Sequence, residues 1–169
     1  MTDDFPADRH AYGRPDAPIT VLEFGDLECP YCRAAAPALR ELVDTSDGQV
    51  RLVWRHFPLF EVHPYALSAA LAAEAAGAHG KFWEMHDELI RHQDRLADQD
   101  LRVAAEALGL DPDDVAGNGA QAYAPGISAD YAAGVELGVR GTPTIFVGRT
   151  RFHGKPTVER LREAVEAAR

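Results

Sequence analysis

The sequence is poor in cysteine, with only two among its 169 residues. Basic side chains are also scarce, because 17 lysines and arginines face 27 aspartates and glutamates and leave a formal net charge of −10. Nucleic-acid binding needs clustered Lys and Arg to contact phosphates, so this balance disfavours it. There is no internal repeat, no low-complexity tract, and no apolar run approaching the length of a membrane span. The length is that of one domain, or of one domain with an insertion.

The two cysteines lie close together, in the motif Cys29-Pro30-Tyr31-Cys32. The apolar run Ile19–Phe24 predicts a buried strand before the motif, and Arg33–Val43 predicts a helix after it. A Cys-x-x-Cys pair at such a turn is typical of reversible dithiol–disulfide chemistry. A static disulfide across so short a loop would constrain the unfolded chain little. Zinc binding stays an alternative, although a zinc site needs about four ligands and the motif supplies two.

The turn favours a reactive first cysteine. Cys29 is expected at the helix N-cap with Pro30 at the first helical position, where the missing N–H and the fixed φ of proline suit the helix. The free N–H groups and the positive end of the helix dipole would then stabilise the Cys29 thiolate, which is the nucleophile. Cys32, one turn further in and less accessible, would resolve the mixed disulfide.

Glu23 stands inside the apolar run of the first strand. A buried carboxylate is costly without a partner or a function, and burial would raise its pKa so that it could exchange a proton with Cys32. Alternatively the strand is an edge strand and Glu23 faces water.

A second motif, Gly141-Thr142-Pro143-Thr144, precedes the apolar run Ile145–Val147. Proline is tolerated at the entrance of a strand. A cis Thr142-Pro143 bond would expose the backbone of Thr142 for an added substrate strand, whereas a trans bond would merely begin the strand.

Together these residues resemble the thioredoxin superfamily and, within it, the DsbA-like thiol–disulfide oxidoreductases, over roughly residues 10–169. Cys29 to Cys32 match the redox motif, Glu23 matches the buried acid, and Pro37 matches the proline that kinks the active-site helix. Thr142-Pro143 matches the cis-proline loop beside the cysteines. The resemblance implies that Cys29, Cys32, Glu23 and Pro143 are catalytic, and that Thr142, Pro30 and Tyr31 contact substrate.

The fold implied is α/β and thioredoxin-like, a central mixed sheet flanked by helices, with an α-helical insertion. The Pro-Tyr pair between the cysteines is typical of glutaredoxins, but the stretch from Cys29 to Pro143 is too long for a minimal thioredoxin or glutaredoxin core. The expected division is a polar N-terminal arm over 1–15, a core over 16–62 and 139–169, and a helical insertion over 63–138.

The hydrophobic pattern predicts βαβ, a helical insertion, and then ββα. The remaining strands are expected at Gln49–Phe57, Ile145–Val147 and Thr150–His153. The remaining helices are expected at Tyr65–Ala76, Lys81–His92, Asp100–Leu108, Ala129–Leu137 and Thr157–Ala168, with a short one beginning at Asp111. Asp100 is the expected N-cap of its helix. Gly117–Ala129 predicts either a mobile loop or a plain connection.

None of the seven histidines has convincing ligand spacing, so most are expected on the surface, and neither a metal nor a cofactor is expected. His56 and His63 flank the exit of the second strand. His56 is either close to the active-site edge or a solvated residue at the strand end.

The function expected is disulfide exchange with protein or peptide thiols, together with a redox partner that the sequence does not identify. A glutathione-linked or transferase-like enzyme and a metal-binding, non-catalytic protein are the alternatives. Met1–His10 carries four charged side chains and no apolar core, which predicts a cytoplasmic protein if Met1 is the natural start. A reducing thiol pool would then favour reduction or isomerisation of disulfides.

Overall fold

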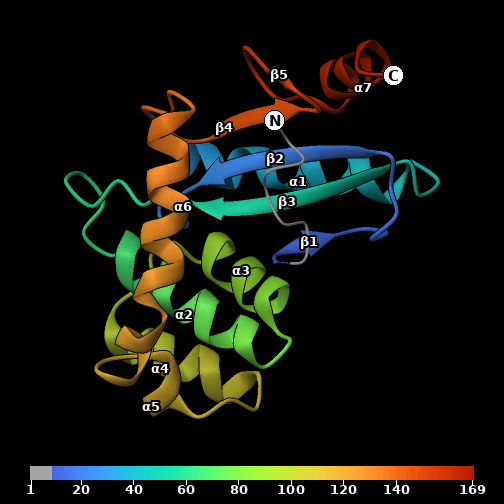
Figure 1. Ribbon diagram of the computed structural model, residues 1–169. Helices are drawn as coiled ribbons and strands as arrows, with labels where there is room; N and C mark the ends of the chain where they lie inside the picture. The colour runs from blue at the N-terminus through green and yellow to red at the C-terminus, as the bar shows by residue number, and fades with distance from the viewer. Residues whose placement is uncertain (1–8) are drawn as a thin grey trace.

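A five-stranded mixed sheet lies at the centre of the fold, in the strand order β1-β3-β2-β4-β5. The computed structural model describes residues 9–169 (Figure 1). β2 runs parallel to β3, and the other neighbouring pairs are antiparallel. The strands are β1 (Ala11–Tyr12), β2 (Ile19–Gly25), β3 (Val50–His56), β4 (Thr144–Val147) and β5 (Thr150–Arg151).

β2 is buried on both faces because it lies in the middle of the sheet. Ile19 and Val21 join a core cluster with α1 (Pro30–Asp44) and α7 (Val158–Ala167), whereas Leu22 and Phe24 join a cluster with residues around α6 (Ala124–Glu136). Side chains alternate between the two faces of a strand. Glu23 therefore shares the face of Val21, under the helix that carries the cysteines.

The helices between β3 and β4 form the lower part of the molecule in Figure 1, except that the last of them rises beside the strands to the level of β4. They are α2 (Ala66–Ala78), α3 (Phe82–Arg91), α4 (Asp98–Ala107), α5 (Pro112–Val115), the 3₁₀ helix η2 (Gly119–Tyr123) and α6. α2 is alanine-rich and is buried almost all round, which lets its neighbours approach closely. The expected α/β architecture is confirmed, while the division into arm, core and insertion stays a prediction.

Three local expectations are wrong. Residues 11–12 form a strand that pairs with Leu52 and Val53, in a stretch expected to be a loose polar arm; residues 1–8 of that arm lie outside the described residues. Asp100 is not an N-cap, because α4 begins at Asp98 with Ala97 as its N-cap, and the Asp100 carboxylate instead accepts the Ala97 N–H at 3.2 Å. α6 begins at Ala124, so much of the segment expected as loop is helical.

Candidate active site

The cysteine pair lies where β2 ends and α1 begins. Cys29 is the N-cap, with extended backbone angles (φ −73°, ψ 122°), and Pro30 is the first helical residue, as the sequence predicts. The two cysteines lie 3.8 Å apart and both are free. The expected difference in accessibility between the two cysteines is very small, since Cys29 is 2% exposed and Cys32 is 0% exposed. The carbonyl of Thr142 lies over Cys29, 3.5 Å from its Sγ.

The two thiols differ in acidity rather than in exposure. A hydrogen bond from Cys32, with further ones from Thr142 and from the backbone at Tyr31 and Cys32, lowers the pKa of Cys29 to about 5 against the opposing effect of burial. Burial raises the pKa of Cys32 well above its ordinary value, and its hydrogen bond to Cys29 and the charge of Glu23 act in the same direction. Cys29 is therefore the thiolate near neutral pH and Cys32 the protonated thiol.

Glu23 is buried, with 2% of its surface exposed. β2 pairs with β3 through Trp54 and with β4 through Ile145 at this position, so the alternative of an edge strand is wrong. Burial, and then the charge of Cys29, raises the pKa of Glu23 to about 8, with Arg40 opposing. Within residues 9–169, its Oε1 has no hydrogen-bond partner. A carboxyl that keeps its proton near neutral pH is suited to exchange that proton during catalysis.

The Thr142-Pro143 bond is cis, as the resemblance implies. The loop is fastened where Thr144 Oγ1 donates to the Gly141 carbonyl at 2.8 Å. While Cys29 is a thiol, its Sγ donates to the Thr142 carbonyl, so that carbonyl is not fully exposed as expected; the Cys29 thiolate cannot donate and leaves it open. The Thr142 hydroxyl is buried beside the cysteines, where its interaction with Cys29 contributes to the lowered pKa of that thiol.

Apolar side chains are available to a substrate around this site. Tyr31 is 74% exposed and follows Pro30, which is exposed as well. A groove of about 430 Å³ lies between the β3–α2 connection and α6, and it ends next to the cis-proline loop at Arg140. Its apolar lining residues are Phe57, Pro58, Leu59, Phe60, Val62, Tyr131, Val135 and Val139.

Asp26 and His63 also belong to the site, and the sequence did not single them out for it. The buried Asp26 carboxylate accepts hydrogen bonds from the Glu28 and Leu59 backbone N–H groups, both at 2.8 Å. His63 Nδ1 lies 2.8 Å from the same carboxylate. The only sequence signals are an acidic residue directly after the strand and a histidine after the next strand.

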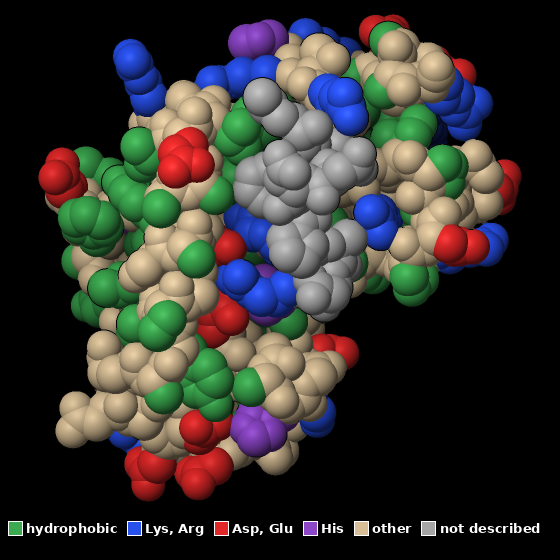
Figure 2. Space-filling model, viewed as in Figure 1, with side chains coloured by type: hydrophobic (Ala, Val, Ile, Leu, Met, Phe, Trp, Pro, Cys, Tyr) green, Lys and Arg blue, Asp and Glu red, His purple; other side chains and the backbone are tan. Residues whose placement is uncertain are grey.

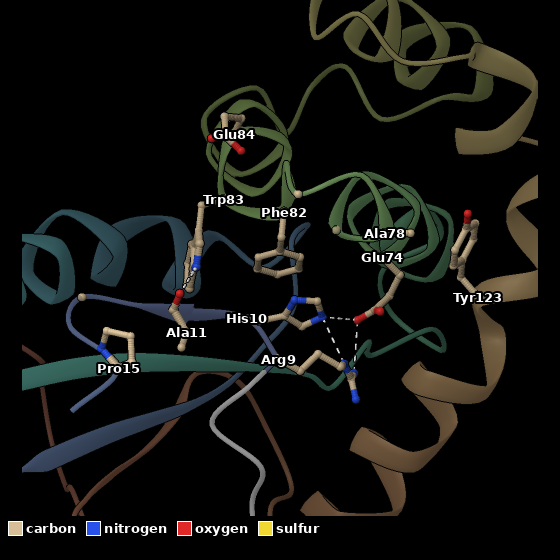
Figure 3. Close-up of a pocket in the computed structure, with 13 residues that line it drawn as sticks. Arg9, His10, Ala11, Pro15, Glu74, Ala78, Phe82, Trp83, Glu84 and Tyr123 are labelled. Atoms are coloured by element: carbon tan, nitrogen blue, oxygen red, sulfur yellow. Dashed lines mark hydrogen bonds and ion pairs between the residues drawn. The ribbon is translucent and has the colours of Figure 1, made fainter. Parts of the chain in front are cut away.

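A second polar cluster lies away from the cysteines, where charged and histidine side chains gather in the hollow beside α6 (Figure 2). His10, His56 and Glu74 offer ligand atoms within 4.8 Å of one another. His10 Nε2 and Glu74 Oε1 lie 2.5 Å apart beside a cavity of about 600 Å³ (Figure 3). His56 is 1% exposed, so its alternative as a solvated residue is wrong.

The orientation of His56 argues against a metal in this cluster. The Trp54 indole N–H, which can only donate, points at His56 Nδ1 at 3.1 Å. The neutral ring therefore carries its proton on Nε2, the atom that faces Glu74, whereas a ligating histidine offers a lone pair there and donates from its other nitrogen. The Arg9 guanidinium also lies 3.2 Å from Glu74 and 2.6 Å from Asp130. The cluster is an ion-pair network that already holds a cation.

Comparison with solved structures identifies the class of protein. BdbD from Bacillus subtilis superposes with a TM-score of 0.83 at 22% identity, covering 95% of this chain and 92% of that one. A thioredoxin-like oxidoreductase from Silicibacter pomeroyi gives 0.80 at 31% identity, over 94% and 90% of the two chains. DsbA2 from Pseudomonas aeruginosa gives 0.73 at 26% identity, over 98% and 96%. The fold is thus that of the DsbA-like thiol–disulfide oxidoreductases.

A family model described as thioredoxin matches residues 6–167, and the chain belongs to the thioredoxin family. Its curated relatives include the Na(+)/H(+) antiporter NhaA 1 of Salinispora arenicola, 49% identical over 160 residues, which are 94% of this chain and 24% of that protein. The NhaA 1 of Mycolicibacterium gilvum is 39% identical over 168 residues, covering 97% and 27%. The chain thus spans about a quarter of the length of these relatives, and their names describe the whole proteins. No helix within residues 9–169 has the length and apolarity to cross a membrane.

Proposed function

We propose that this protein exchanges disulfides with protein or peptide thiols through the Cys29–Cys32 pair. The observation that carries the proposal is the opposite acidity of two adjacent thiols, because the pKa of Cys29 is lowered to about 5 and that of Cys32 is raised. A thiolate beside a protected thiol is what attack followed by resolution requires.

In the reducing direction, the Cys29 thiolate attacks one sulfur of a substrate disulfide and releases the other as a thiolate. Cys32 then loses its proton and attacks the Cys29 sulfur, which forms the Cys29–Cys32 disulfide and releases the second substrate thiolate. Two electrons pass from the cysteine pair to the substrate. Glu23 assists as the proton acceptor for Cys32 after losing its own proton, and that loss becomes easier in the mixed disulfide, because the Cys29 charge that helps to raise the pKa of Glu23 is then gone.

Extended polypeptide is the proposed substrate. The cis-proline loop brings the Thr142 backbone to the cysteines, and a substrate strand could pair there by backbone hydrogen bonds. Tyr31 and the apolar groove that ends at Arg140 would hold the flanking side chains. Backbone pairing tolerates many sequences, so we expect broad substrate choice.

We also propose that the protein acts as a reductant or isomerase in the cytoplasm. The pKa of Cys29, about 5, lies between roughly 7 for thioredoxin and roughly 3.5 for the oxidant DsbA. A stabilised thiolate favours the reduced form, so this position supports a reduction potential between about −270 and −120 mV. Trapping the free thiols in cells, together with equilibration with glutathione, would test this proposal. A potential near −120 mV with an oxidised cysteine pair in cells would contradict it.

Trapping experiments test the exchange itself. Cys32→Ser should accumulate mixed disulfides with oxidised and scrambled protein substrates, because resolution is blocked, whereas Cys29→Ser should accumulate none. The wild type should accelerate insulin reduction by dithiothreitol, and each variant should lose that activity. Trapping by Cys29→Ser alone would reverse the two roles, and an inactive wild type would refute the function.

A further inference from the structure

The active-site turn is fastened to the connection between β3 and α2 at two points. The Asp26 carboxylate receives the Leu59 N–H and lies 2.8 Å from His63 Nδ1, and Glu28 Oε2 receives the Tyr65 N–H at 2.7 Å. A carboxylate with two backbone N–H donors is an acceptor, so His63 Nδ1 carries the proton and donates to it. The ring of His63 is thereby held in one orientation by a buried anion.

Asp26 also contacts both cysteines through its backbone. Its N–H donates to Cys32 Sγ at 3.5 Å, and its carbonyl accepts the Cys29 N–H at 3.1 Å. Asp26 therefore links the two cysteines, which its backbone contacts, to His63, which its side chain contacts. The Asp26 side chain is fully buried, while that of His63 is 20% exposed and open to protons from solvent.

The charged groups that most affect His63 are anionic. They are Asp26 and Glu28 in the turn before α1, and Cys29 at the start of α1. Burial would lower the pKa of His63, but the hydrogen bond and charge of Asp26, and then the charges of Cys29 and Glu28, raise it above its ordinary value. The imidazolium form is thus favoured while Cys29 is a thiolate.

We propose, within the function proposed above, that His63 is a positioning residue of the redox pair: held by Asp26, its imidazolium stabilises the Cys29 thiolate and couples reduction to proton uptake. When a substrate dithiol reduces the pair, two electrons break the Cys29–Cys32 bond and a substrate disulfide forms. Of the two protons that the substrate releases, one goes to Cys32. The negative charge left on Cys29 raises the proton affinity of His63, so the second proton binds His63 in a fraction of the molecules and goes to solvent in the others.

His63→Asn is the variant that tests this coupling, because an amide can still donate to Asp26 but cannot carry the charge. His79→Asn is the matched control. His79 Nε2 forms the same kind of pair with Asp114, at 2.9 Å, between α2 and α5. Urea unfolding would first establish that both variants are folded. The measurements are the thiolate absorbance of Cys29 against pH and the equilibrium of the Cys29–Cys32 pair with glutathione.

His63→Asn should raise the pKa of Cys29 and lower the equilibrium constant for oxidising glutathione roughly threefold to tenfold, which is about 15 to 30 mV towards a more reducing potential. Between pH 6 and 8, the variant should also bind fewer protons on reduction than the wild type, by at most about half a proton. A purely structural role of His63 would leave this number of protons unchanged. His79→Asn should match the wild type in all three quantities.

A measurement on the wild type makes the test independent of any variant. Since coupling is reciprocal, the imidazole pKa of His63, followed by NMR, should be higher in the reduced than in the oxidised protein, and that of His79 should be equal in both. An equal pKa of His63 in the two states, or a His63→Asn variant that matches His79→Asn, overturns the proposal. Failure of the proposed function would look different: insulin would not be reduced, while the redox-dependent titration of His63 would persist.

Discussion

At the scale of single residues, the chemistry of the site depends on which of its buried groups carry a proton. Cys29 is held as a thiolate by hydrogen bonds, whereas Cys32 and Glu23 are held protonated by burial. Glu23 gains nothing from a hydrogen bond to its Oε1 in the described structure, so its carboxylate form is strongly disfavoured. Glu23 lies near a thiol that must lose its proton, and it can accept that proton once it has lost its own. The buried carboxyl also destabilises the fold as pH rises above the acid range.

Glu23→Gln should therefore stabilise the protein and slow resolution. Because the pKa of Glu23 is raised from 4.5 to about 8, the folded protein binds more protons than the unfolded chain between those values, and wild-type stability falls as pH rises through that window. The variant removes this loss and should be more stable by on the order of 4 kcal/mol at pH 8, with little difference near pH 4. Urea unfolding across this range tests it.

Glu41→Gln provides the control, because this glutamate of α1 has a side chain that is 58% exposed. It should leave both the unfolding curve and the decay of the mixed disulfide unchanged. Parallel stability curves for the wild type and Glu23→Gln, with equal resolution rates, would rule out the proton role of Glu23.

The roles that the sequence could predict at this scale are those encoded within a few residues. Cys29 and Pro30 at the start of α1 follow from local turn chemistry, and the burial of Glu23 follows from its apolar strand together with the family resemblance. Asp26 and His63 could not be found in that way, because they meet only when the β3–α2 connection folds over the turn. His56 is buried by Trp54 and Glu74, which local patterns do not bring together.

At the scale of elements, a buried ion-pair network ties β1 to the helices. Arg9 bonds Asp130 of α6 at 2.6 Å, and His10 stacks on Phe82 of α3, with ring centroids 3.7 Å apart. Asp130 also accepts the His56 backbone N–H at 3.0 Å, at the end of β3. Such a network positions the helical part against the sheet, and removing one member leaves buried charge behind.

Asp130→Asn should destabilise the protein by about 2–4 kcal/mol, because the buried Arg55, whose Nε lies 3.6 Å from the carboxylate, would lose that charge. Asp98→Asn is the control, since Asp98 pairs with Arg102 at 2.8 Å with a side chain that is 60% exposed, and exposed pairs contribute about 1 kcal/mol or less. Thermal and urea unfolding measure both. Equal losses from the two variants would show that the network contributes no more than a surface pair.

The elements themselves were largely predictable where their hydrophobic period is strong, as in β2, β3, α3 and α7. The errors fall where a tertiary contact overrides local preference. β1 is held by pairing with β3 and by the ion-pair network rather than by its own sequence. The start of α6, at Ala124, lacks strong apolar anchors in sequence but packs Ile127 against Ala70 and Leu71 of α2.

At the scale of the whole molecule, the redox pair is part of the core rather than an attachment to it. Cys29 and Cys32 belong to the same buried cluster as Trp54, the alanines of α2 and Met85 of α3. The protonation state of the two cysteines therefore affects the stability of both the sheet and the helical part. The balance between a stabilised thiolate and the constraint of a disulfide then determines which redox form is the more stable.

The stability of the reduced form relative to the oxidised form should consequently depend on pH. The pKa of Cys29 is lowered from 9.0 to about 5, so its contribution to stability is fully present above pH 9 and is lost as pH falls towards 5. The oxidised protein has no thiolate and lacks this contribution. Between pH 5 and 7 the reduced form should gain about 2 kcal/mol relative to the oxidised form. The short disulfide loop offsets this by a similar amount at every pH, about 2 kcal/mol in the chain-entropy model.

Urea unfolding of the oxidised protein and of the protein kept in dithiothreitol, at pH 5, 6, 7 and 8, measures this difference directly. The reduced form should be the less stable one near pH 5 and should overtake the oxidised form as pH rises, because only the thiolate contribution changes. Cys29→Ser removes the thiolate and the disulfide together, so its stability should be the same with and without dithiothreitol at each pH. A difference between the two redox forms that stays constant from pH 5 to 8 would mean that the Cys29 thiolate is not stabilised by the fold.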